Sequence, residues 1–294
     1  MEDDAALIEQ LRAAVDRRLA ELLPDRAARP RRLADAARYA LLSPGKRFRP
    51  MLTLLAAREF GCEPAVALDA ACAFEMVHAA SLILDDLPSM DDANLRRGRA
   101  TTHREFDEAT AILAAVGLLN QAFAVIAHDD RLTDAARGAL SRRLSEAVGF
   151  HGLVAGQAMD LIDRDRDRSP ADLDLLNHRK TGVLMVAAAE AGALIAGASD
   201  EAVTHVGEFA RRLGLAFQIH DDLIDVEAVH ETGKDLGKDA GMTTVVSALG
   251  VDGAREAMED HLEAAEASLA AAGAEGLLAR YALEFFEARK AAAA

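Results

Sequence analysis

The stretch FEMVHAASLILDDLPSMDD, residues 74–92, places aspartates directly after an apolar run of helical character. Asp85 and Asp86 end that run, and Asp91 follows Pro88, which we expect to end or kink the helix. The spacing from Asp85 to Asp91 does not keep both on one face of a continuous helix. A break at Pro88 would instead let the two ends of the motif converge.

A second acidic cluster, LAFQIHDDLIDV at residues 215–226, has the same apolar setting. On a helix, Asp221 and Asp225 lie one turn apart on the same face, and Asp222 lies three residues before Asp225. Grouped carboxylates repel one another and resist burial unless a cation neutralises them. Carboxylate oxygens are the ligands that magnesium prefers, together with water and substrate phosphates. Two such clusters favour a metal site over a solvated acidic face.

The rest of the chain predicts an all-α protein with a single helical domain over residues 1–294. Alanine and leucine dominate, aromatic residues make up 4%, and tryptophan is absent, which favours helix over strand. Leucine or valine recurs every four residues from Leu7 to Leu19, which predicts an opening helix that stops at Pro24. Thr133, Ser169 and Ser199 are predicted caps of later helices. No strand or hairpin signal is evident, and no interdomain linker or repeat interrupts the chain.

Composition also excludes several classes of protein. With 33 Lys and Arg against 49 Asp and Glu, the net charge of −16 argues against nucleic-acid binding. Cys62 and Cys72 have no metal-ligand spacing, as expected of core thiols in a reducing cytosol. The stretch most like a membrane span, residues 182–198, is short and carries Glu190, so we interpret it as a buried helix. We expect a cytoplasmic protein without a membrane span.

Basic residues beside glycines supply the opposite charge. PGKRFRP (44–50) contains Lys46, Arg47 and Arg49, and Arg96 and Arg97 follow the first acidic cluster. HRKTG (178–182) and TGKDLGKD (232–239) contribute further lysines and a threonine: Lys180, Thr181, Lys234 and Lys238. Carboxylates that hold magnesium, with Lys and Arg to neutralise phosphate, indicate an enzyme that acts on diphosphates inside an apolar helical cavity.

These motifs, in this order, closely resemble the trans-isoprenyl diphosphate synthases, the polyprenyl synthetase family, from about Arg32 to Leu249. VGFHGLVAGQAMDL (148–161) and ETGKDLGKDAG (231–241) look most like the bacterial members that make geranylgeranyl diphosphate, with farnesyl diphosphate synthases close behind. The resemblance implies a helical bundle around a central cavity, a homodimer, and about three magnesium ions bridged by substrate diphosphate. It implies condensation of isopentenyl diphosphate with an allylic diphosphate (dimethylallyl, geranyl or farnesyl) by ionisation, condensation and elimination.

The resemblance also assigns roles to individual residues. Asp85, Asp91 and Asp221 would hold magnesium, supported by Asp86, Asp222 and Asp225. Isopentenyl diphosphate would be bound by Lys46, Arg49, His78 and Arg97, and the allylic diphosphate by Arg96, Lys180 and Lys238. Thr181 and Gln218 would line the cation site, where oxygen dipoles favour developing positive charge. A lone histidine on an apolar helix is usually a core residue, but His78 lies seven residues before Asp85 and so on nearly the same face.

Product length in this family depends on side chains just below the first aspartate motif. Here Ala80 and Ser81 are small, which favours a twenty-carbon product over a fifteen-carbon one. A floor built by another helix, for example near Leu119 or Phe123, stays open as an alternative. Two residues depart from the family pattern. Pro44 replaces a glycine, which should alter the turn but leave Lys46 and Arg49 in place. Met242 replaces a lysine that contacts diphosphate, so we expect weaker allylic binding.

Two other classes of function remain as alternatives. A class I terpene cyclase shares magnesium-assisted ionisation and a helical fold, but it needs no second diphosphate pocket, so Lys46, Arg49 and Arg97 argue against it. A non-catalytic subunit of a heteromeric synthase is disfavoured by two intact aspartate motifs, although Met242 keeps it open.

Overall fold

The computed structural model describes residues 2–25, 27–162, 169–232, 244–274 and 276–293, with the backbone alone for residues 2, 3, 170, 225–232 and 287–293. Helices form nearly all of it, and the predicted all-α fold is confirmed. In chain order the elements are α1 (Glu2–Leu22), α2 (Arg31–Leu41), α3 (Phe48–Glu59), α4 (Pro64–Asp85), β1 (Leu95–Arg96), β2 (Arg99–Ala100), α5 (Thr102–Glu105), α6 (Glu108–Ala127), α7 (Asp134–Val148), α8 (Leu153–Ile162), α9 (Pro170–Asn177), η1 (His178–Gly182), α10 (Val183–Ile195), α11 (Asp200–Thr232), α12 (Val245–Ala271) and α13 (Leu277–Ala293).

The predicted helix starts are confirmed by their caps. The hydroxyl of Thr133 accepts a hydrogen bond from the backbone N–H of Ala136, and Ser169 forms a reciprocal capping box with Asp172. Ser199 accepts from the N–H of Ala202 at the start of α11. Each cap satisfies a backbone donor that a helix start would otherwise leave without a partner.

The prediction of no hairpin is wrong at residues 95–100, where β1 and β2 pair antiparallel. Arg97 and Gly98 both have positive φ, +53° and +74°, as a two-residue turn of this hand requires. Asparagine or aspartate usually precedes the glycine in such a turn, and an arginine in that place gave no signal. The correction matters because this hairpin carries Arg96 and Arg97.

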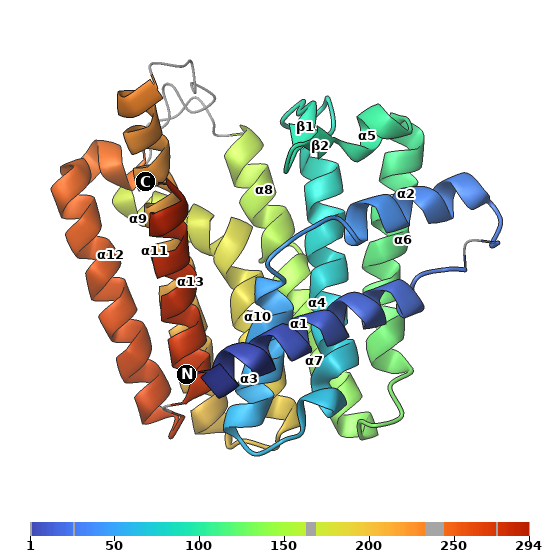
Figure 1. Cartoon of the computed structure of the whole chain (residues 1–294), viewed down its shortest axis with the longest axis horizontal. Helices are drawn as coiled ribbons and strands as arrows, with labels where there is room; N and C mark the ends of the chain where they lie inside the picture. Colours follow the sequence, from blue (N-terminus) through green and yellow to red (C-terminus); the bar gives the residue numbers. More distant parts are fainter. Residues whose placement is uncertain (1, 26, 163–168, 233–243, 275, 294) are drawn as a thin grey trace.

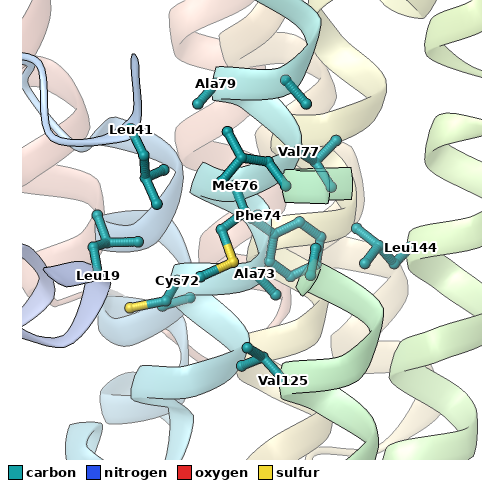
Figure 2. Packing of buried hydrophobic residues seen from close by; sticks show 14 of the residues in the cluster. Leu19, Leu41, Cys72, Ala73, Phe74, Met76, Val77, Ala79, Val125 and Leu144 are labelled. Atoms are coloured by element: carbon teal, nitrogen blue, oxygen red, sulfur yellow. The ribbon is translucent and has the colours of Figure 1, made fainter. Parts of the chain in front are cut away.

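Helix α4 is the centre of the first of two hydrophobic clusters. It packs against α1, α2, α3, α6, α7 and α10. Figure 2 shows Phe74 of α4 in this cluster with Leu19 of α1, Leu41 of α2, Val125 of α6 and Leu144 of α7. All five side chains are nearly or completely buried, so α4 is fixed along its length.

The second cluster is built from α3, α10, α11, α12 and α13, with Ile8 of α1 added. Helices α3 and α10 contribute to both clusters. Figure 1 shows α11, α12 and α13 on one flank and α2 and α6 on the other, with α4, α8 and α10 between them. The predicted helix over residues 182–198 is α10, whose inward side chains are buried as expected.

In the part of the chain that the structure describes, two helices are long and apolar enough to cross a membrane by length and composition alone. They are α4, whose most apolar window is 72% buried, and α6, whose window is 39% buried. Burial makes α4 a core helix. Helix α6 instead carries exposed apolar side chains, Ile112, Leu113 and Val116, along one face.

Candidate active site

A cavity of about 870 Å³ lies where the two clusters meet. Segments far apart in sequence line it: the loop before α3, helices α4, α8, α10, α11 and α13, the β1–β2 hairpin and η1. Of the residues predicted from sequence, it gathers Lys46, Arg49, His78, Ser81, Asp85, Asp91, Arg96, Arg97, Lys180, Thr181, Gln218 and Asp221. The predicted carboxylate and basic residues therefore share one cavity.

The first aspartate motif folds back on itself as the proline predicted. Helix α4 ends at Asp85, and the backbone N–H of Asp91 donates to the carbonyl of Asp85 at 2.9 Å. Burial raises the pKa of Asp85 to about 6, and the neighbouring charges of Asp91 and Asp86 add to this while Lys180 opposes it. Two acidic side chains thus line the cavity together, and one of them resists ionisation.

Asp86 has a different partner from its neighbour. Its carboxylate is 3% exposed and accepts from Nε of Arg96 at 2.8 and 3.0 Å. This pairing fixes the guanidinium of Arg96, which lines the cavity from the hairpin. The structure therefore places Asp86 behind Arg96.

The basic part of the cavity comes from the loop before α3, from the first turn of α3, from α4 and from the hairpin. A Cβ on Gly45 would meet Nη1 of Arg97 at 2.6 Å, and that nitrogen donates to the carbonyl of Pro44 at 2.9 Å. Only glycine permits this approach, which brings Arg97 beside Lys46 and Arg49.

Electrostatics differ among these basic residues. Burial lowers the pKa of Arg49 to about 10, and Arg97 lowers it further while Glu75 opposes the change. Burial and the charge of Arg49 lower the pKa of His78 well below 6.5, so its imidazole is neutral at physiological pH. His78 can bind an anion only by hydrogen bonding, whereas the arginines supply the charge.

Arg47 lies in the same basic motif, but its guanidinium is paired with carboxylates of the protein itself. Its guanidinium is 5% exposed and donates to Glu75 at 2.9 Å and to Asp16 at 2.7 Å. Its φ of +50° places it in the left-handed region, at the residue before α3. Arg47 therefore fixes the shape of the loop that carries Lys46.

A π-helical turn, η1, presents two predicted residues side by side. A Cβ on Gly156 of α8 would meet the backbone N of Lys180 at 2.5 Å, and one on Gly214 of α11 would meet the Cα of Gly182 at 3.1 Å. These close approaches seat η1 between α8 and α11. Both Lys180 and Thr181 line the cavity, and π-helical turns are frequent at functional sites.

Hydrogen bonds fix the side chains of this turn. Nζ of Lys180 lies 2.5 Å from the carboxylate of Asp160 on α8. The hydroxyl of Thr181 donates to Oε1 of Gln218 on α11 at 3.0 Å. Because its proton is committed to Gln218, the threonine oxygen has lone pairs left for the cavity.

The second aspartate motif lies on α11 as predicted. Asp221 lines the cavity, whereas Asp222 accepts from the backbone N–H of Val245 at 3.4 Å, near the start of α12. The side chain of Asp225 and all of Lys238 and Met242 lie outside the described residues. Their predicted roles stay predictions.

The two residues expected to control product length point in different directions. Ser81 lines the cavity, with its hydroxyl donating to the carbonyl of His78 at 2.9 Å. Ala80 is 2% exposed and lies in the first core cluster, against which Leu119 and Phe123 also pack. Successive helix residues diverge by about 100°, so only one of the pair lies toward the cavity.

Several lining residues were missed from sequence. Phe48, Phe217 and Phe285 line the cavity together, and Glu75 lies among the basic side chains. Leu153 of α8 and Met185 of α10 are apolar lining residues. The apolar stretches around the motifs gave no signal that separates core from cavity wall, and Phe285 lies far from every motif in the chain.

Comparison with known proteins agrees with this site. The polyprenyl synthetase family model matches residues 30–273. The chain is 47% identical to the geranylgeranyl diphosphate synthase of Pantoea ananas, over 99% of this chain and 95% of that protein. It is 41% identical to the farnesyl diphosphate synthase of Geobacillus stearothermophilus, over 96% of each. The crystal structure of an FPP/GFPP synthase from Zymomonas mobilis superimposes with a TM-score of 0.84 at 35% identity, covering 95% of this chain and 98% of that one. With its helical fold and its aspartate motifs meeting basic residues at one cavity, this chain belongs to the polyprenyl synthetase family.

Proposed function

We propose that the protein is a trans-prenyltransferase that condenses isopentenyl diphosphate with an allylic diphosphate to give a short-chain prenyl diphosphate, with geranylgeranyl diphosphate as the favoured product. One observation carries the proposal. A single cavity joins an acidic region (Asp85, Asp91 and Asp221) to a basic region before and along α3 and α4. The relatives named geranylgeranyl and farnesyl diphosphate synthase support the same class of reaction.

Two charged regions suit two diphosphates. Lys46, Arg49 and Arg97 can bind one diphosphate without a metal ion, because Arg and Lys match phosphate oxygens. Arg96 and Lys180 lie with the aspartates and suit the second. A terpene cyclase acts on one diphosphate and would leave the first region without a ligand.

The acidic region fits magnesium as a cofactor. Carboxylate oxygens are hard ligands, and burial raises the pKa of Asp85 by more than the charges of Lys180 and Arg96 lower it, as suits an acid that a bound cation would neutralise. Among the described residues no three acidic, histidine or cysteine side chains form a ready-made metal cluster, so substrate oxygens would complete the coordination of ions held by Asp85, Asp91 and Asp221. Bound magnesium would supply positive charge that stabilises the departing diphosphate.

The chain's own residues would guide the reactive end of the allylic substrate. Thr181 and Gln218 present oxygen dipoles to the cavity, which favour positive charge developing on the allylic carbon. The ring of Phe217 and the side chain of Met185 exclude water from the same region. The double bond of isopentenyl diphosphate then attacks the cationic carbon, and loss of a proton completes the product.

Product length rests on the wall at Ser81. A small side chain there leaves room for the growing prenyl chain to pass along α4. Ser81→Phe should therefore shorten the main product to fifteen carbons, whereas Ala80→Phe would disturb the core. An unchanged product from a folded Ser81→Phe variant would place the floor on another helix.

The first experiment is a product assay. Purified protein, magnesium and labelled isopentenyl diphosphate would be given dimethylallyl, geranyl or farnesyl diphosphate in parallel, with chain length read by chromatography. A twenty-carbon product supports the proposal in full, and a fifteen-carbon product supports the reaction class alone. The absence of product with every primer, from protein that is shown to be folded, would favour a non-catalytic subunit.

We also propose that the protein is a homodimer joined through α6. Beyond the first turn, which carries Glu108, the exposed side of this helix runs through Ile112, Leu113 and Val116 to Asn120 without a charged residue. A second copy is the natural cover, since a two-fold axis would pair the same face with itself. Helix α6 lies on the flank opposite α12 (Figure 1).

Light scattering tests this assembly. Leu113→Glu with Val116→Glu should give a monomer, while Leu249→Glu, on an exposed leucine of α12, should leave the mass unchanged. A monomeric wild-type protein, or a dimeric α6 variant, would contradict the assignment of this face.

A further inference from the structure

We infer that Phe285 of the C-terminal helix α13 is a positioning residue for isopentenyl diphosphate, acting by holding the ammonium group of Lys46. This inference rests on the proposed function. It concerns a residue that belongs to no motif and lies near the far end of the chain.

The contact itself is direct. Nζ of Lys46 lies 4.6 Å from the centroid of the Phe285 ring, and both side chains line the cavity. A cation over an aromatic face is attracted by the ring's quadrupole, and the ring adds no negative charge that phosphate oxygens would have to displace. The ring can therefore orient Lys46 without competing for its charge as a carboxylate would.

Lys46 benefits from such a restraint. Its side chain is exposed, in a loop between Gly45 and the left-handed Arg47. A lysine side chain that becomes fixed loses the entropy of its many rotamers. Because Phe285 already holds the side chain before the ligand arrives, less of this entropy is lost when the ligand binds.

Phe285 is itself held by the segments it serves. Its ring centroid lies 4.1 Å from that of Phe48, two residues after Lys46. On the other side it lies 6.0 Å from the ring of Phe217, which precedes Gln218. Offset aromatic contacts of this kind define ring orientation. Phe285 thus ties the loop of Lys46 to the part of α11 that faces the reacting carbon.

The placement predicts an effect on one substrate only. Lys46 belongs to the metal-free diphosphate region, whereas Arg96 and Lys180 lie with the aspartates. Loss of the ring should weaken the binding of isopentenyl diphosphate and leave the binding of the allylic substrate unchanged. A general loosening of α13 would affect both substrates and the stability.

The experiment compares Phe285→Leu, Phe285→Tyr and Phe286→Leu in the full-length protein. Phe286 is the adjacent ring, 2% exposed, and packs edge-on to His220. Phe285→Leu should raise the KM for isopentenyl diphosphate about fivefold, with the allylic KM changed less than about twofold. Phe285→Tyr keeps the ring face and should restore the wild-type KM. Phe286→Leu should lower the thermal midpoint without changing the ratio of the two KM values.

A double-mutant cycle with Lys46→Met identifies the route of the effect. In the Lys46→Met background, Phe285→Leu should add less than about twofold to the KM, since the ring has no ammonium group left to hold. The same fivefold rise in both backgrounds, or an equal rise for both substrates, would overturn the inference. Absence of condensation by the wild-type protein would instead count against the proposed function, so the two failures are distinguishable.

Discussion

Asp69 and Asp85 lie near opposite ends of α4, and the protein treats these two carboxylates in opposite ways. Asp69 accepts from Nε of Arg18 at 2.7 Å and lies 2.8 Å from Nη2 of Arg131. Burial alone would raise its pKa, but the hydrogen bond from Arg18 and the charge of Arg131 lower the pKa below its usual value. At Asp85 burial prevails and raises the pKa to about 6.

The difference lies in where the countercharge comes from. At Asp69 two arginines from α1 and the α6–α7 connection supply it, and they tie three segments together. At Asp85 no lysine or arginine among the described residues forms an ion pair, and Lys180 lies instead on Asp160. The same residue type on one helix is thus structural where the protein neutralises it, and suited to a bound cation where the protein does not.

The largest expected effect follows from removing the negative charges that line the cavity. Asp85→Asn with Asp221→Asn should reduce turnover by at least about a thousandfold, because charge stabilisation of the leaving group is lost. The thermal midpoint without metal should change little by comparison, because each asparagine keeps the shape of the aspartate that it replaces and removes a negative charge from a crowded acidic region. Steady-state kinetics and calorimetry on the same preparation test both parts, and retained activity would refute the metal assignment.

The structural charge should behave in the opposite way. Asp69→Asn should lower the free energy of unfolding by about 2 kcal/mol, a value reduced from that of a fully buried pair because both arginines are partly exposed. Activity per folded molecule should be unchanged, because Asp69 is far along α4 from the cavity. Urea unfolding at pH 7 measures the first, and turnover normalised to folded protein measures the second. A stable but inactive Asp69→Asn variant would contradict the structural role of Asp69 and its difference from Asp85.

Ligands should stabilise the folded protein only where Asp85 and Asp221 are intact. Magnesium with inorganic diphosphate, at about five times the dissociation constant, should add about 1 kcal/mol to wild-type stability. Asp69→Asn should gain the same increment, and the Asp85→Asn, Asp221→Asn variant should gain none. Thermal shift with magnesium alone and diphosphate alone provides the controls.

The smallest effect concerns pH. A lowered pKa in the folded state means that Asp69 contributes stability above its unfolded value of about 3.9 and loses it as the pH falls through the folded value. The stability difference between wild type and Asp69→Asn should therefore stay constant from pH 7 to about 5. Below about pH 5 it should begin to shrink, because the unfolded chain takes up a proton at Asp69 before the folded protein does. A stability difference that grows on acidification would contradict the lowered pKa of Asp69 in the folded protein.

Local signals in the sequence predicted most of the fold. Thr133 and Ser169 cap helices because their hydroxyls satisfy nearby backbone donors, and Pro88 follows the end of α4 as expected. The hairpin was missed because Arg97 occupies a left-handed position without the usual asparagine.

Side-chain direction was harder to predict than position. Arg47 and Arg49 share one short motif and both line the cavity, yet the guanidinium of Arg47 is paired with Asp16 and Glu75. Ala80 and Ser81 are neighbours, and only Ser81 lines the cavity. Phe285 depends on the packing of α13 against α3 and α11, a long-range contact for which no local pattern exists.

The π turn at His178–Gly182 also limits how this chain can change length. Such a turn is an α-helix that has accommodated one additional residue. Deleting a single residue within it would restore α-helical hydrogen bonding and leave the rotation of α10 relative to α9 nearly unchanged, because the deletion removes the one residue that the bulge accommodates. Buried alanines of α10, such as Ala188 and Ala191, would keep the face that packs on α3 and α4. The same deletion would displace Lys180 and Thr181 from the cavity, so the length of the chain at this turn is limited by the site and not by the core.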